Sequence, residues 1–178
     1  DITDNVIDLL IYRLRRLPSE TQAAIRMAAC IGFQFDVKTL SLITGCFPEQ
    51  THERIKPAIQ EEMIVPVPAD EDPIHLQVYD SQENVWFRFQ HDRIQQAAYS
   101  LVDEDERKSI HFAIGKILLE SMPEEKIEED VFDVLSHLNF ASISIDLPEE
   151  RTKLAELNLK AGLKSISTAA FEPAYTYL

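Results

Sequence analysis

Apolar residues recur at helical spacing through the first third of the chain. The stretches with this period are 4–17, 20–31, 36–44 and 49–63. Prolines and glycines, which commonly stand at helix ends, mark their limits at Pro18, Gly32, Gly45 and Pro48. Asp4 and Asp36 are the expected N-caps of the first and third helices. Pro57 falls inside the fourth stretch, where its missing N–H is expected to bend or shorten the helix.

The period then changes to that of β-strands. Runs of β-branched and aromatic residues occupy 64–68, 74–79 and 85–89, and acidic turns separate them. Three helices followed by a small antiparallel sheet is the layout of a winged helix. The sequence therefore predicts a winged-helix domain over 19–102.

The second half returns to helical spacing. Apolar stripes predict helices over 92–101, 110–118, 131–140, 154–166 and 169–178, with loops at 123–130 and 142–148. The last two helices resemble a tetratricopeptide pair, in which small residues such as Ala155 and Ala161 permit close packing. One such repeat cannot bury its own face, so further repeats are expected beyond Leu178. The predicted class is mainly α with a small antiparallel β-sheet, a winged helix followed by an α-helical, TPR-like bundle over 103–178.

Composition limits what such a protein does. The chain has 178 residues, 45% of them hydrophobic, and a net charge of −14. No apolar run approaches the roughly 20 residues of a membrane span, so no membrane role is expected. Two cysteines without metal-like spacing indicate a reducing, cytoplasmic setting. Because helical patterns run up to both ends, we expect a piece of a longer protein.

No catalytic or metal-binding pattern is present. Gly115–Lys116 lacks the preceding glycine and the following hydroxyl of a phosphate-binding loop, and its neighbours form an amphipathic helical stripe. His52–Glu53 is not followed by the second histidine of a zinc motif. The histidines are dispersed, and His111 and His137 lie among apolar neighbours, as core or surface histidines do. We therefore expect no catalytic residue, no metal and no cofactor in this segment, and no enzyme activity of its own.

The predicted winged helix is a poor candidate for DNA binding. Its third helix, 49–62, holds four acidic and two basic residues, and the following turn at 69–73 holds three acidic ones. Binding to phosphates requires lysine and arginine on these elements. Nucleic acid is therefore not an expected partner, although a winged-helix transcription factor stays the less favoured alternative.

One motif stands at the junction of the last strand and the next helix, in the segment 87–99. Asp92 is a natural N-cap, and Gln95 three residues later would complete a capping box. In this interpretation His91 only ends the strand.

The same segment resembles a known signature. Gln90-His91-Asp92, between an aromatic strand and an Ile-x-x-Ala helix, is similar to the Met-His-Asp motif of winged helices in STAND-class signalling ATPases. Together with segments 28–35 and 157–162, it resembles large bacterial AAA-like regulators, in which an ATPase is fused to a Ser/Thr kinase or to sensor and histidine-kinase domains.

The resemblance implies a regulatory role. The motif's histidine, here His91, contacts the β-phosphate of ADP in a neighbouring nucleotide-binding domain, and 1–18 is then a linker helix from that domain. Asp92 would hold the histidine's backbone, while Arg88 and Arg93 would add positive potential. The parent protein would bind ADP or ATP with Mg²⁺, and this segment would bind the upstream domain, downstream repeats and protein partners. A protein-interaction scaffold without a nucleotide role stays open as an alternative.

Overall fold

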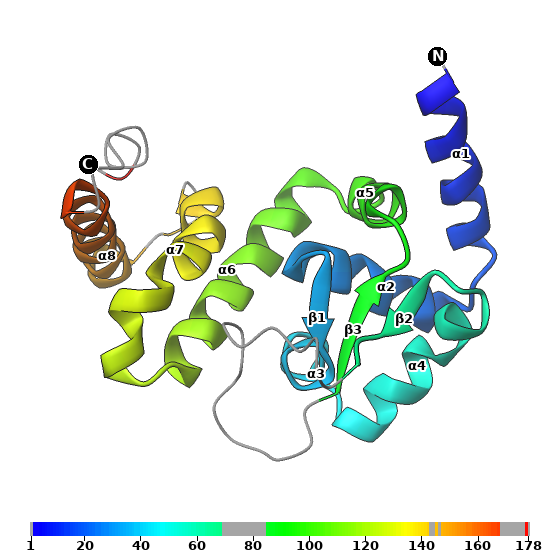
Figure 1. The fold of residues 1–178 in the computed structure, drawn as a ribbon, viewed down its shortest axis with the longest axis horizontal. Helices are drawn as coiled ribbons and strands as arrows, with labels where there is room; N and C mark the ends of the chain where they lie inside the picture. The colour runs from blue at the N-terminus through cyan, green and yellow to red at the C-terminus, as the bar shows by residue number, and fades with distance from the viewer. Residues whose placement is uncertain (1, 69–84, 143–144, 146, 168–176, 178) are drawn as a thin grey trace. The chain divides into compact units, whose positions relative to one another are not determined.

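A computed structural model of the protein describes residues 2–68, 85–142, 145, 147–167 and 177 (Figure 1). The chain forms two compact units, which we name the helix–sheet unit (1–110) and the helical unit (111–178). The helices are α1 (Ile2–Arg15), α2 (Ser19–Ile31), α3 (Val37–Thr44), α4 (Pro48–Gln60), α5 (Asp92–Ser100), α6 (Glu104–Ser121), α7 (Glu124–Phe140) and α8 (Pro148–Ser167). The strands are β1 (Gln34–Asp36), β2 (Ile64–Pro66) and β3 (Trp86–Phe89). The predicted class, mainly α with a small antiparallel sheet, is confirmed.

The sheet has the order β1-β3-β2, and both pairings are antiparallel (Figure 1). Phe35 lies opposite Phe87, and Ile64 lies opposite Phe89. The sequence did not predict β1, because three residues after Gly32 are too few to show an alternating pattern. The strand predicted over 74–79 lies outside the described residues.

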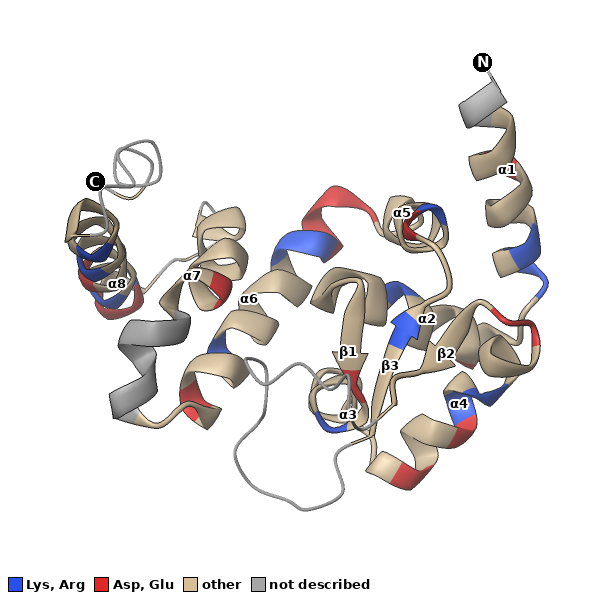
Figure 2. Ribbon diagram, viewed as in Figure 1, with Lys and Arg blue, Asp and Glu red and all other residues tan. Residues whose placement is uncertain are grey.

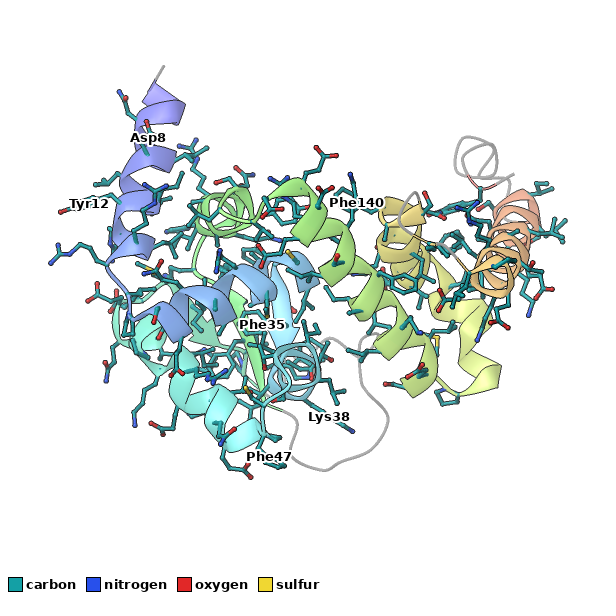
Figure 3. All side chains as sticks on the ribbon, turned by 180° about the vertical axis from the view of Figure 1, so that it is seen from behind. Asp8, Tyr12, Phe35, Lys38, Phe47 and Phe140 are labelled. Carbon is teal, nitrogen blue, oxygen red and sulfur yellow. The ribbon has the colours of Figure 1, made fainter. Side chains whose placement is uncertain are left out.

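The core of the helix–sheet unit is built around the central strand. Phe35 is fully buried, and its ring centroid lies 6.2 Å from that of Phe87 and 5.8 Å from that of Phe89. Figure 3 shows Phe35 inside this unit and Phe47 at its edge. The small inner face predicted for α2 is confirmed, since Ala24, Ala28 and their neighbours are buried there. Helix α1 packs against α5 and contributes Leu14 to this core.

Local capping explains several helix limits. Asp36 is the N-cap of α3, where its Oδ1 accepts a hydrogen bond from the Thr39 amide at 2.8 Å. Gly45 ends that helix with φ of 65°, a left-handed conformation that glycine adopts without strain. Asp4 is not an N-cap, because α1 already begins at Ile2. Helix α4 continues through Pro57 and ends one turn later at Gln60, shorter than the predicted 49–63.

In the helical unit, most of the loop predicted over 123–130 is helical instead. Helix α7 begins at Glu124 rather than at residue 131, directly after Pro123. Segment 124–130 is rich in glutamate, which favours the first turns of a helix, but it lacks the apolar stripe on which the prediction relied. Helix α8 likewise begins at Pro148, six residues before its predicted start. Of the helix predicted over 169–178, only Tyr177 is described.

Candidate functional site

The predicted site lies where β3 passes into α5, and the backbone there is well fixed. The His91 carbonyl accepts a hydrogen bond from the Ile94 amide at 3.0 Å, which begins the helix. The Gln90 amide donates to the Met63 carbonyl at 3.0 Å. These bonds tie the junction to its own helix on one side and to the turn between α4 and β2 on the other.

The predicted capping box at this junction is wrong. His91 is the N-cap, without a side-chain cap bond, and Asp92 is the first helical residue. The Asp92 carboxylate accepts from the adjacent Arg93 amide at 2.8 Å. The Gln95 side chain turns away and donates to the Ala29 carbonyl of α2 at 3.2 Å. The Gln95 side chain, which the local pattern assigned to a capping box, therefore makes a long-range contact between α5 and α2 instead.

The four predicted site residues differ in their surroundings. His91, Asp92 and Arg93 are consecutive and exposed, whereas Arg88 is half-buried on the central strand. Phe87 and Phe89 face the core, so Arg88 points to the other side of the sheet. The His91 ring forms no hydrogen bond with any residue in the described part of the chain. Its imidazole is therefore accessible to a group from outside this fold.

Gly115 and Lys116 have structural roles in the middle of α6. A Cβ added at Gly115 would lie 2.5 Å from Cδ2 of Leu138, so the glycine permits α7 to approach. The Lys116 ammonium lies 3.1 Å from Oε1 of Glu150 on α8. Neither residue belongs to a phosphate-binding loop. Among the described residues, no group of three or more histidine, cysteine, aspartate or glutamate side chains is arranged to hold a metal ion.

Helix α4 contains both acidic and basic residues (Figure 2). Glu53 pairs with Lys56 at 3.3 Å, and Arg54 lies 3.4 Å from Glu20 of α2. Both basic side chains of α4 thus face carboxylates, which weakens any attraction for phosphates. The acidic turn at 69–73 lies outside the described residues.

A histidine pair is the feature that the sequence did not reveal. Nδ1 of His111 on α6 lies 2.8 Å from Nδ1 of His137 on α7, and the Phe140 ring packs on His111 with centroids 4.5 Å apart. Burial, and then the neighbouring His111, lower the pKa of His137 to about 4. The sequence pattern places each histidine among apolar neighbours on its own helix. It does not indicate that the two rings are in contact, because they lie on different helices.

No family model and no solved structure matches this sequence. The chain is similar to hybrid signal transduction histidine kinase G of Dictyostelium discoideum, with 28% identity over 214 aligned residues. The alignment covers 99% of this chain and 6% of that protein. The chain thus resembles a small part of a long signalling protein. No described helix is long and apolar enough to cross a membrane.

Proposed function

We propose that this chain is a non-catalytic regulatory segment of a larger signal-transduction ATPase. The helix–sheet unit closes on a neighbouring nucleotide-binding domain, and His91 contacts the β-phosphate of its bound ADP. The observation that carries the proposal is the exposed His91 imidazole, which forms no hydrogen bond with the residues that the structure describes although its backbone is fixed on both sides. The order of helices and the β1-β3-β2 sheet support the winged-helix interpretation on which the motif depends.

The free energy of a hydrogen bond between His91 and the β-phosphate is of the size that a conformational switch needs. A protonated imidazole beside a phosphate forms a charge-assisted hydrogen bond, which contributes about 1.5–3 kcal/mol. That energy shifts a closed-to-open equilibrium roughly ten- to a hundredfold. Because β3 and α5 hold the junction in place before binding, little ordering entropy opposes the contact.

The surrounding residues have supporting roles in this proposal. Asp92 begins α5 and accepts from the Arg93 amide, which fixes the turn beside the histidine. Arg88 and Arg93 add positive potential near the phosphate. The ATPase domain of the parent protein supplies the site for ADP or ATP with Mg²⁺, and this chain has no cofactor of its own.

The proposed role in signal transduction is supported by the similarity to the Dictyostelium discoideum histidine kinase. That protein is a signal transduction histidine kinase by name, and the matched part is a small fraction of its length. We infer that the present chain also lies within a multidomain protein, where α6–α8 relay a signal from following helical repeats to a fused kinase output. The proposal places the parent protein in the cytoplasm, where thiols stay reduced, and both cysteines of this chain are free.

The test uses the full-length protein that contains this segment. His91→Ala is expected to release a fluorescent ADP analogue roughly ten- to a hundredfold faster and to raise basal output. His52→Ala is the matched control, because His52 is also exposed but lies on α4. Unchanged ADP release in the His91 variant would reject the clamp. A Walker A motif encoded upstream of this segment is a second requirement, and its absence would also reject it.

A second candidate, a protein-interaction scaffold, has one observation in its favour. Leu159, Leu163 and Ile166 lie at helical spacing on α8 and are about half exposed, with Leu163 at 57%. A partner helix would bury this stripe. Leu163→Glu would then abolish capture of the partner while ADP release stays unchanged. Capture that survives deletion of the helix–sheet unit would favour the scaffold over the switch.

A further inference from the structure

Two imidazoles meet edge to edge in the helical unit. The ring centroids of His111 and His137 are 5.0 Å apart and their Nδ1 atoms 2.8 Å apart, so these nitrogens form the facing edges of the rings. The planes differ by 32°, and His137 is only 9% exposed. The Phe140 ring covers His111 from the same helix that carries His137; Figure 3 labels Phe140. The contact is a partly buried hydrogen bond between α6 and α7.

The hydrogen bond between the two rings exists only in certain protonation states. A bond between two ring nitrogens needs one N–H donor and one unprotonated acceptor. The neutral pair satisfies this when one ring carries its proton on Nδ1. One added proton is tolerated, because a charged ring still donates to a neutral one. A second added proton must go to the accepting Nδ1, and then two N–H groups with positive charge face each other at hydrogen-bond distance.

We propose that His111 and His137 form an acid-released latch, which joins α6 to α7 while one of the facing nitrogens is unprotonated and opens when both are protonated. The latch is independent of the proposed nucleotide clamp. It connects two helices of the unit that is inferred to relay signals, so its opening changes the relay without any change at His91.

Burial of His137 and its repulsion from His111 both oppose a second proton on the pair. The shift in His137 has two causes, burial and the charge of His111, and no carboxylate of the described residues is among them. On α7, Asp133 lies one turn before His137 and is exposed. Helix α8 meets α7 through the amides of Asn139 and Asn158, which exchange two hydrogen bonds of 2.9 Å. Four basic side chains of these helices have other partners: Lys108 pairs with Glu104 and Lys116 with Glu150, while Arg107 lies over the Tyr99 ring and Lys164 over the Phe132 ring.

The direction of the pH effect follows from the lowered pKa of His137. Between its ordinary value of 6.5 and about 4, the open form binds a proton that the closed form excludes. The closed form is therefore fully favoured above pH 6.5 and loses stability as the pH falls toward 4. Relative to pH 8, the open-to-closed ratio is expected to rise about tenfold at pH 5.5 and about 80-fold at pH 4.5.

Hydrogen exchange of the whole chain measures this opening. Amides in 131–140 report the latch, amides in 25–29 of α2 serve as the internal reference, and rates are corrected for the chemical effect of pH. The wild type should lose protection in 131–140 by the stated factors while the reference changes less. His137→Phe should remove this pH dependence, and His52→Gln should keep it.

Several results would overturn the latch. One is a wild-type profile in 131–140 that is as flat as that of His137→Phe, and another is a slope that persists in His137→Phe. If that variant fails to fold, His111→Phe removes the acceptor–donor pair from the α6 side and must flatten the profile in the same way. An NMR titration of the wild type provides an independent check, since a His137 ring that titrates near its ordinary value would also exclude the latch.

Discussion

Gly115→Ala tests how closely α6 and α7 approach each other. The new methyl group would lie 2.5 Å from Cδ2 and 2.6 Å from Cγ of Leu138, well inside van der Waals contact. Alanine in a helix interior gains about 1 kcal/mol over glycine, whereas inserting a methyl group into a packed interface costs about 1–3 kcal/mol. The structure therefore predicts a net destabilisation of up to about 2 kcal/mol rather than the gain expected for an open helix.

A double-mutant cycle with Leu138→Ala isolates the contact. Leu138→Ala alone should cost about 2–5 kcal/mol, because Leu138 is buried. In that background the space beside residue 115 is empty, so Gly115→Ala should stabilise the chain by about 1 kcal/mol. The coupling between the two sites is then about 1–3 kcal/mol, within the range found for residues in contact.

The assay must follow the helical unit separately. The single tryptophan, Trp86, lies in the helix–sheet unit, so its fluorescence reports that unit, while far-UV circular dichroism in urea reports both. An unfolding transition that is seen by circular dichroism but not by Trp86 fluorescence is assigned to the helical unit, residues 111–178. Stabilisation by Gly115→Ala in the presence of Leu138, with additive effects in the cycle, would refute the close approach.

Three further outcomes follow from the helix–sheet unit. Phe35→Ala should lower its unfolding free energy by about 3–5 kcal/mol, seen as a lower urea midpoint of Trp86 fluorescence, because the ring is fully buried between two aromatic neighbours. Asp36→Ala should cost about 0.5–2 kcal/mol, since the Thr39 amide loses its cap. Cys30 should react with a thiol reagent only after Cys46 in native protein, because burial raises the pKa of the Cys30 thiol to about 12; equal rates would contradict this.

Local signals predicted most helices of the helix–sheet unit. The small inner face of α2, the N-cap Asp36 and the left-handed Gly45 act within one or two turns, so the residues themselves determine them. Strand β1 was missed because three residues show no period of their own. It is a strand because β3 offers hydrogen-bonding partners, with Phe35 lying opposite Phe87.

At the candidate site, the sequence located the junction but not its side-chain contacts. The strand-to-helix transition and His91 follow from the pattern of residues, and the exposed position of His91 is a property of the folded unit. Gln95 was assigned to a cap by its spacing from Asp92, yet it bonds to the carbonyl of Ala29, 66 positions away in sequence. A distant acceptor that folding brings close competes successfully with a local one.

The sequence by itself determined the class of the protein, the periods of its helices and the absence of phosphate-loop and metal-binding patterns, because these depend on neighbours along the chain. Only the tertiary structure decided that Gly115 admits Leu138 and that His111 faces His137. The physical reason is that both contacts join different helices. The distances between the residues in these contacts depend on how α6 and α7 pack against each other. The sequence around each residue does not indicate which residue of the other helix it will contact.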